Sequence, residues 1–566
     1  VVNRTTVTLD ANWTVSGAGS KVIVGDGLSA TTLVLPVGAA LTGTVDVTNL
    51  GTLQIVNTSL PTFGTLSLGS TVDFAQTTSP YVVATGTTYH HLKLTGNTKT
   101  FASGTVSVNG NLTIDGVTDF NGAASPFTSL NIAGNFSLQG GSTFEADGTG
   151  DSKRITVTCT GSGTQTFSGG DFYLFRLQTP AAGTLNIILS SANLTLGNAN
   201  GGGLLLLQNT HTLSLNSNTL TLHESGLFYG TNVGTLSGTT TSNLVIDKTL
   251  NTGSIGSIGF ATGAQLLNSL SYNCTSGTST TLTLSSDLTL AGNLTMTAGK
   301  IDIGANDLSV TGTATSSNYS YVMTSGSGFL KLLDVNGSRF APIGNSTYNA
   351  VTVNNTDGLD WNLRVEDALD VDDPLFSGNT VKAVQREWFV NPVTYPTTTN
   401  STIVFEYNDG DATQIGGSYN INANVQVWRK QPGPPNPFNW VAYSGTQFPG
   451  GTPGSDRTAQ VTGFNSFTGY SFAISNLDGP LPVKLIDFKV QKINNGLANL
   501  TWELAACCSN AAKFEIQKSG DSRSFVSFAT VNGSETNRFY TYNDSRLGAG
   551  ITYFRVLLCD VECCGS

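Results

Sequence analysis

A short motif recurs in this chain between alternating apolar and polar runs, and it restricts the possible folds. Copies of the pattern Gly/Ala-Asn-Leu/Phe-Thr/Ser begin at Gly110, Gly134, Ala192 and Gly292, with a looser copy at Ala11. The flanking runs, such as 106–108 and 112–114, have the period of two that is typical of a strand with one buried face. Gly and Asn both tolerate positive φ, so the Gly-Asn pair predicts a corner between two strands.

Two arrangements satisfy this strand–corner–strand pattern. Hairpins would build a meander or a sandwich, whereas coils stacked in parallel would build a β-solenoid, in which each unit contacts only its neighbours. The separations between the four closest copies are unequal, and they indicate an irregular period near 25. Stacked coils would also align Asn, Thr and Ser side chains in ladders and so explain their abundance. We therefore favour a solenoid.

Composition supports an all-β fold. Only 11% of the residues are charged, against roughly 25% in an average soluble domain. Short neutral polar residues replace them, and these favour strands over surface helices.

The net charge of −11 argues against nucleic acid as a partner. No apolar run approaches the ~20 residues needed to cross a bilayer, so we expect no membrane insertion.

Shifts in composition predict three domains. Residues 1–325 carry the repeats and form the expected solenoid, while residues 326–479 hold four of the six tryptophans and form an expected β-sandwich. Residues 480–566 form a second expected sandwich, a seven-stranded immunoglobulin-like or fibronectin-like module. Its predicted strands are marked by alternation at Leu500, Trp502 and Leu504, at Phe514 and Ile516, and at Tyr553 and Arg555.

Several segments resemble a known kind of protein. The stretches 481–488 (LPVKLIDF), 500–502 (LTW), 514–519 (FEIQKS) and 553–555 (YFR) resemble the fibronectin type III-like module near the C-terminus of many secreted Bacteroidota proteins. The segments 339–348 (RFAPIGNSTY) and 386–388 (REW) resemble the domain that often precedes it. The repeats are similar to the long β-rich ectodomains of such proteins.

This resemblance implies an extracellular or cell-surface location. Relatives are exported by the type IX secretion system, with a C-terminal sorting domain that is removed when the protein is released or attached to the surface. The chain begins at Val1 and carries no basic and apolar leader. We expect that a leader has been removed or that the sequence is a fragment, and that the sorting domain is not included.

A β-helical polysaccharide lyase or hydrolase is the main enzymatic alternative. Such enzymes need grouped charges, for example two carboxyl groups about 5 to 10 Å apart in a glycosidase. The acids of the repeat region 1–325 occur singly, as at Asp46, Asp73, Asp115, Asp247 and Asp287. The one dense group is Asp147, Asp151, Lys153 and Arg154, which we interpret as a solvated corner loop. We expect no catalytic residue.

Metal-ligating patterns are sparse. His90 and His91 are adjacent, so a regular strand would point them to opposite faces. His211 and His223 would be neighbours only in successive coils, and we interpret all four histidines as surface residues. The most acidic segment, 357–373, suggests a structural Ca²⁺ site at Asp370, Asp372 and Asp373, with a solvated acidic loop as the alternative. No other cofactor is expected.

The cysteines and tryptophans leave alternatives open. Cys159 and Cys274 stand alone and are expected to be small core residues. The five others crowd near the C-terminus, where disulfides and inert buried thiols are the main alternatives, because a zinc site would favour regular CxxC pairs and the adjacent pairs here lack that spacing: Cys507, Cys508, Cys559, Cys563 and Cys564. Trp428 and Trp440 would stack on sugars if exposed, but tryptophan in a sandwich is usually core.

The sequence thus predicts a non-catalytic extracellular structural or adhesive surface protein. Its expected partners are further copies of itself, in a fibre or layer, or surface glycans. The alternatives are the polysaccharide lyase or hydrolase with accessory domains, and a glycan-binding protein.

Overall fold

The all-β prediction is confirmed. The computed structural model describes the chain except residues 79–80, 118–127, 147–153, 199–202, 225, 228–233, 251–254, 277–279, 368, 370–381, 395, 397–400, 423–424, 433–437, 443–446, 465–470, 477–484, 495, 505–512, 535–536, 548–549 and 560–566. The described part is about 60% strand and contains no α-helix, hence none long and apolar enough to cross a membrane. It divides into two compact units, Val1–Tyr348 and Asn349–Ser566.

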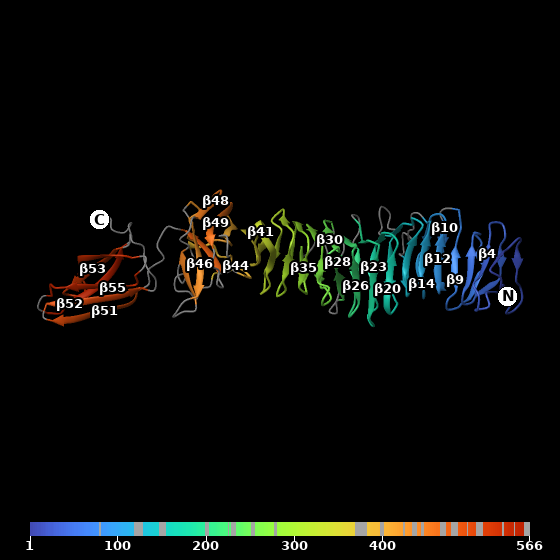
Figure 1. The fold of residues 1–566 in the computed structure, drawn as a ribbon, viewed down its shortest axis with the longest axis horizontal. Helices are drawn as coiled ribbons and strands as arrows, with labels where there is room; N and C mark the ends of the chain where they lie inside the picture. The colour runs from blue at the N-terminus through green and yellow to red at the C-terminus, as the bar shows by residue number, and fades with distance from the viewer. Residues whose placement is uncertain are drawn as a thin grey trace. The chain divides into compact units, whose positions relative to one another are not determined.

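The first unit is the predicted solenoid. It makes about 13 turns over residues 6–344, and its coils appear in Figure 1 as successive rungs. Strands of successive coils pair in parallel, as Leu92 does with Leu112 and Phe136 with Phe167. The two pairs have different separations in the sequence. The coil length is therefore irregular, as the spacing of the motifs indicated.

Each complete coil supplies one strand to each of three faces, in the order face 1, face 2, face 3. Face 1 contains β1 (Thr6–Thr8), β4 (Thr31–Leu35), β7 (Gly51–Ile55), β9 (Thr71–Phe74), β12 (His91–Thr95), β15 (Leu112–Asp115), β17 (Phe136–Gln139), β20 (Gly163–Ser168), β23 (Leu185–Ser190), β26 (Thr212–Asn216), β29 (Thr235–Gly238), β32 (Leu266–Leu267), β35 (Leu288–Leu290), β38 (Leu308–Val310) and β41 (Leu330–Ala341). Face 2 contains β2 (Trp13–Thr14), β5 (Leu41–Thr42), β10 (Tyr81–Val83), β13 (Lys99–Phe101), β18 (Phe144–Ala146), β21 (Phe172–Leu174), β24 (Leu194–Leu196), β27 (Thr219–His223), β30 (Asn243–Lys248), β33 (Ser269–Cys274), β36 (Leu294–Ala298) and β39 (Ala314–Ser316). Face 3 contains β3 (Lys21–Val24), β6 (Thr44–Val47), β8 (Thr62–Leu66), β11 (Thr88–Tyr89), β14 (Gly104–Val108), β16 (Thr128–Ile132), β19 (Ile155–Cys159), β22 (Arg176–Gln178), β25 (Leu204–Leu206), β28 (Gly226–Leu227), β31 (Gly256–Ile258), β34 (Thr281–Leu284), β37 (Lys300–Asp302), β40 (Tyr321–Met323) and β42 (Ile343–Gly344).

The interior is filled by rows of apolar side chains, one per coil. On face 1 the buried row is Leu33, Leu53, Val72, Leu92, Leu112, Phe136 and Phe167. Burying each large side chain stabilises the fold by about 1.5–3 kcal/mol. The Phe136 ring also packs against Phe172 of face 2, with centroids 4.8 Å apart. Residues that alternate between apolar and polar in the sequence thus alternate between the inside and the outside of the coil.

The glycine of the repeated motif has a different role from the one predicted. Gly110, Gly134 and Gly292 do not have the left-handed φ that would require glycine. The next coil instead stacks directly on the corner: a Cβ on Gly134 would lie 2.5 Å from the carbonyl oxygen of Gly110 and 2.5 Å from Asn111 Oδ1. The motif needs glycine for close approach of the backbones, and the positive-φ explanation was wrong.

The asparagine of the motif links neighbouring coils. Asn111 Oδ1 accepts the backbone N–H of Asn135 at 2.9 Å, and Asn135 Oδ1 accepts that of Thr166 at 2.9 Å. Asn193 does the same before face 2, accepting from Thr219 N at 2.8 Å. Each side chain satisfies a backbone donor at a corner where the strand ladder is interrupted. We call these bonds the corner ladder.

Aspartate can occupy the same position. Asp287 Oδ1 accepts Asp307 N at 2.8 Å, and Asp307 Oδ1 accepts Phe329 N at 2.9 Å. The position therefore requires an acceptor rather than an amide.

Residues 349–476 form a two-layer antiparallel sandwich. Its strands are β43 (Val351–Glu366), β44 (Glu387–Pro392), β45 (Ser401–Asn408), β46 (Val425–Pro432), β47 (Phe438–Ala442), β48 (Gln447–Gly451), β49 (Asp456–Phe464) and β50 (Ser471–Asn476). The long strand β43 belongs to both layers, because its first part pairs with β45 and its last part with β44. The rings of Trp388, Phe405 and Phe472 pack in the core, with centroids 5.3–5.4 Å apart.

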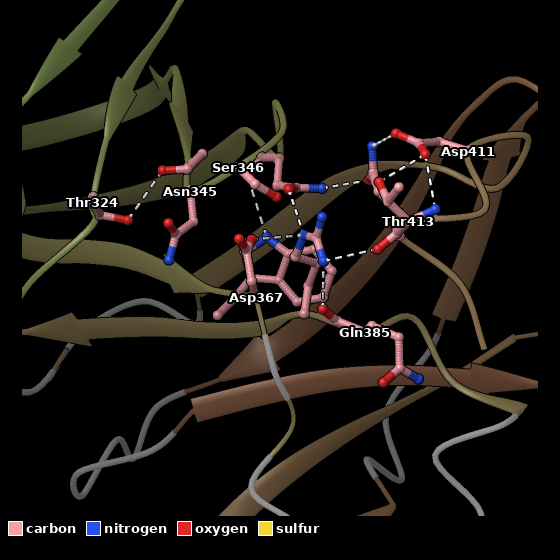
Figure 2. A network of polar contacts seen from close by, with 12 residues as sticks. Thr324, Asn345, Ser346, Asp367, Gln385, Asp411 and Thr413 are labelled. Atoms are coloured by element: carbon pink, nitrogen blue, oxygen red, sulfur yellow. Dashed lines mark hydrogen bonds and ion pairs between the residues drawn. The ribbon is translucent and has the colours of Figure 1, made fainter.

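A buried polar network surrounds Arg386, which is 1% exposed. Its guanidinium donates to Asn349 Oδ1 at 3.0 Å and to the carbonyl oxygens of Gln385 and Thr413 at 2.7 and 3.3 Å. Figure 2 shows Gln385 and Thr413 in this network, with Asp411 accepting the backbone N–H of Thr413. A buried guanidinium must have its donors satisfied. The Arg-Glu-Trp segment noted in the sequence is therefore part of the folded core.

The C-terminal module consists of two three-stranded antiparallel sheets. The described strands are β51 (Leu485–Asn494), β52 (Leu497–Leu504), β53 (Lys513–Ser519), β54 (Val526–Asn532), β55 (Phe539–Asp544) and β56 (Tyr553–Cys559), in the orders β51-β52-β55 and β54-β53-β56. Leu500, Trp502 and Leu504 are buried, as their alternation predicted. On β56 the outcome differs, because Phe554 and Val556 pack on the core while Tyr553 is 41% exposed.

We expect Asn135→Ala to destabilise the solenoid by about 1 kcal/mol and to accelerate amide hydrogen exchange at Thr166, since it removes one hydrogen-bond acceptor. Asn135→Asp keeps an acceptor and should retain most of the protection. Asn131→Ala, in the middle of the preceding strand β16, is the control. Unchanged exchange at Thr166 in Asn135→Ala would contradict the role of the corner ladder.

Candidate functional surfaces

The two charged groups singled out in the sequence lie almost wholly outside the described residues. Asp370, Asp372 and Asp373, the predicted Ca²⁺ ligands, are among them, so that prediction stays open. Asp147, Asp151 and Lys153 also lie there. Arg154 is described, and its guanidinium carbon lies 4.7 Å from the centre of the Phe175 ring, a cation–π contact. Among the described residues, no three His, Cys, Asp or Glu side chains form a group suited to a metal.

The single acids of the solenoid each contact a neighbouring coil. Asp115 forms an ion pair with Lys93 at 3.1 Å, and Asp247 accepts from Asn273 Nδ2 at 2.9 Å. The other three follow the same principle. Asp46 pairs with Lys21, Asp73 accepts from Gln54 and Thr95, and Asp287 belongs to the corner ladder. These contacts run along the axis of the solenoid, so the carboxylates hold coils together instead of converging on a groove.

His90 and His91 take part in corner contacts rather than pointing away as surface residues. His90 lies just before β12, and its Nδ1 accepts Gly69 N from the preceding coil at 3.1 Å. His91 Nδ1 accepts Asn111 N from the following coil at 2.9 Å, so His91 stands where other coils have Asn. The two rings lie edge to face with centroids 4.3 Å apart. Burial lowers the pKa of both imidazoles, and the charge of His90 further lowers the pKa of His91.

His211 corrects the interpretation of the histidines as surface residues, whereas the side chain of His223 is 35% exposed. His211 is 1% exposed, and neither of its ring nitrogens has a hydrogen-bond partner within the described part of the chain. His223 ends β27 on face 2 and lies 3.6 Å from Asp247. His211 precedes β26 of face 1 in the same coil, so the pair does not occupy successive coils. Sequence context could not show that His211 points inward, because a corner residue lacks the strand alternation.

The ammonium group of Lys99 is buried inside the solenoid. Its Nζ donates to the carbonyl oxygens of Gln76, Thr95 and Asn97 at 3.1, 2.6 and 3.2 Å. Burial lowers the pKa of Lys99 to about 8, with the charge of Asp73 opposing the shift. The ammonium group satisfies carbonyls at a corner, which is again a structural role.

Trp440 and the two isolated cysteines are core residues. Trp440 is 1% exposed, and Trp428 is partly buried beside it, which supports the core interpretation over sugar stacking. Cys159 and Cys274 are buried free thiols, as expected, and burial raises the pKa of both. Cys559 ends β56, whereas Cys507, Cys508, Cys563 and Cys564 lie outside the described residues.

An open groove of about 350 Å³ lies on the outer face of the sheet β51-β52-β55. Three cross-strand rows build this face. They are Asp487–Glu503–Phe539, Lys489–Thr501–Thr541 and Gln491–Asn499–Asn543. Phe539 is 60% exposed, and Lys489 forms an ion pair with Asp487. The first two rows line the groove, and the third row continues the same face beyond it. We call the groove together with this third row the outer groove.

The outer groove was not predicted from the sequence, although the alternation along β52 indicates part of it. Trp502 faces the core, so alternation places Thr501 and Glu503 on the opposite face of β52. The pairing of β52 with β51 and β55 brings the three rows together, and these strands are not all adjacent in the sequence.

A smaller groove of about 250 Å³ lies beside His90 in the solenoid, lined by Leu66, Leu68, Thr88, Tyr89 and Asn109.

These features define an all-β protein with a long parallel β-solenoid. Comparison of the chain with protein-family models, with curated proteins and with solved structures finds no match.

The His91 contact predicts a loss of stability in acid. Nδ1 can accept the Asn111 N–H only while it is unprotonated, and the pKa of His91 in the folded protein is below its ordinary value of 6.5. The unfolded chain therefore binds more protons in this range, and stability falls as the pH drops from about 7 through 6.5 toward the lowered pKa. His91→Asn, which supplies a non-titrating acceptor, should reduce this fall.

The measurement is the unfolding midpoint in denaturant between about pH 7 and 5. Asn131→Ala, which changes no titratable group, is the control and should keep the pH dependence of the parent protein. An equal pH dependence in His91→Asn and the parent would show that His91 does not cause it.

Proposed function

We propose that the protein is a non-catalytic extracellular structural or adhesive surface protein. The observation that carries this proposal is that the polar and charged side chains of the solenoid bond to neighbouring coils. Corner asparagines and aspartates, paired carboxylates, His90, His91 and Lys99 all do so. Such contacts make a stiff support. About 13 turns at ~4.8 Å per coil give a solenoid about 60 Å long.

The extracellular location rests on the resemblance to secreted Bacteroidota proteins. Export by the type IX system and a place on the cell surface follow from that resemblance and are part of the proposal. The low content of charged residues is compatible with it. Association of copies into a fibre or layer extends the proposal, because strand edges and regular polar faces can pair between molecules.

The polysaccharide lyase or hydrolase remains the competing hypothesis. Its catalytic groups would have to converge on a groove of the solenoid, whereas the single acids bond along the axis: Asp46, Asp73, Asp115, Asp247 and Asp287. This arrangement favours the structural role.

A turnover screen separates these two classes. The full chain, incubated with neutral and uronic-acid polysaccharides, is expected to release neither new reducing ends nor unsaturated products. A heat-denatured sample of the same chain sets the background. Steady product formation proportional to protein concentration would overturn the non-catalytic proposal.

Electron microscopy of the native protein at neutral pH tests self-assembly. Regular filaments or sheets are the expected result, and separate rods would contradict assembly.

The same sample with a chelator tests the predicted Ca²⁺ site at Asp370, Asp372 and Asp373. Dissolution that Ca²⁺ reverses would support that site, while intact polymers would argue against a Ca²⁺-dependent assembly.

A further inference from the structure

We propose that the outer groove of the C-terminal module binds a neutral oligosaccharide. This inference deepens the proposed adhesive role and rests on it, since it names the class of partner that an adhesive surface protein would contact. The residues come from three strands of one sheet, β51, β52 and β55, so their spacing is fixed by the backbone ladder.

The aromatic residue of the groove is the first part of the argument. Phe539 is 60% exposed, and its neighbour Tyr540 fills the core on the opposite side of β55. A single exposed apolar side chain needs no explanation by itself. Here the ring stands at the end of a row of hydrogen-bonding groups, and the apolar C–H face of a sugar ring packs on an aromatic face. The guanidinium carbon of Arg538 lies 6.0 Å from the centre of the Phe539 ring, which still leaves most of the side chain exposed.

The hydrogen-bonding groups are the second part. Glu503 lies between Asp487 and Phe539 in one row, and its carboxylate interacts electrostatically with Lys489 of the next row. A carboxylate accepts strong hydrogen bonds from hydroxyl groups.

The next two rows add neutral polar groups. The hydroxyls of Thr501 and Thr541 are followed by a band of side-chain amides. Asn499 Nδ2 donates to Thr541 Oγ1 and to Asn543 Oδ1, both at 2.8 Å. These bonds orient the groups before a ligand arrives, which reduces the entropy lost on binding.

Charge selects the kind of sugar. Asp487 and Glu503 carry two negative charges and Lys489 one positive charge, while Arg538 adds a positive charge beside the Phe539 ring, so the groove carries no strong net charge at neutral pH. An anionic polysaccharide would meet Glu503 with like charge, which is unfavourable. A neutral chain avoids this repulsion and still offers hydroxyl donors to the carboxylates. The groove volume of about 350 Å³ lies within the size range of small-molecule sites.

The strand geometry sets the length of the ligand. Alternate residues on one face of a strand are ~6.8 Å apart, so the three rows span roughly 14 Å. A ligand of several linked sugar rings contacts all three rows, whereas a monosaccharide contacts one. Affinity should therefore rise from monosaccharide to hexasaccharide.

The test uses the full chain and isothermal titration with cellohexaose, xylohexaose, mannohexaose and maltohexaose, and with oligogalacturonate as the anionic probe. At least one neutral hexasaccharide is expected to bind with a Kd between about 10 μM and 1 mM. Phe539→Ala should weaken this binding by about tenfold or more, and Glu503→Gln by about three- to tenfold. Tyr553→Ala is the matched control, because it removes an exposed aromatic ring from the other sheet of the same module, and it should change Kd by less than about twofold.

Circular dichroism of each variant checks that the module remains folded. Absence of binding by the parent chain to all four neutral hexasaccharides at about 10 mM would overturn the inference. So would equal effects of Phe539→Ala and Tyr553→Ala, or tighter binding of oligogalacturonate. Tighter binding of a lysine-rich peptide than of any sugar would also overturn it and assign the carboxylates to a cationic partner.

The failure of this inference is distinguishable from failure of the proposed function. Release of sugar products in the turnover screen would refute the non-catalytic role even if the groove binds a glycan. Absence of glycan binding would remove the groove as the ligand site and leave the microscopy and turnover results unchanged.

Discussion

Parallel hydrogen bonding between successive coils governs the structure of the first unit. Each complete coil supplies strands to three faces, and these strands pair with the coils on either side. Corners interrupt the ladders, and backbone donors there need another acceptor. Side chains of the corner ladder provide one: Asn111, Asn135, Asn193, Asp287 and Asp307. The repeated motif thus supplies the acceptors that the corner backbone N–H groups of the next coil need.

The same stacking explains the composition of the solenoid surface. Polar side chains that repeat from coil to coil find partners of the same kind directly above and below, as Thr113 and Ser137 do at 3.3 Å. Charged side chains do so less often, because like charges in such a row would repel. Where charged residues do occur, a residue of one coil can pair with a residue of opposite charge in the next coil, as Lys93 does with Asp115. Few charges and many hydroxyls are therefore what a stacked parallel sheet favours.

The C-terminal module presents a different surface. Its outer groove carries the exposed ring of Phe539, the carboxylate of Glu503 and oriented amides on one face of a short antiparallel sheet. The solenoid, in contrast, directs its acids along its own axis. This contrast underlies the proposed division between a supporting solenoid and a ligand-binding module. In both units the chemistry of the surface follows from how the strands are paired.

Local patterns in the chain were enough to predict the all-β class, the solenoid and its irregular coil length, because the period of two and the spacing of the motif need no knowledge of distant contacts. They also located the buried residues of β52 and the core cysteines.

The role of the motif glycine was not predictable in this way, since the close approach of Gly134 to Gly110 exists only when two coils are stacked. The contacts between polar residues likewise required the folded chain. His91 takes the place of an asparagine and His211 turns inward, while Asp487, Glu503 and Phe539 share a row although they come from three separate strands. Register between strands sets these contacts, and alternation within one strand fixes which face a residue occupies but not which residue of a distant strand lies opposite it.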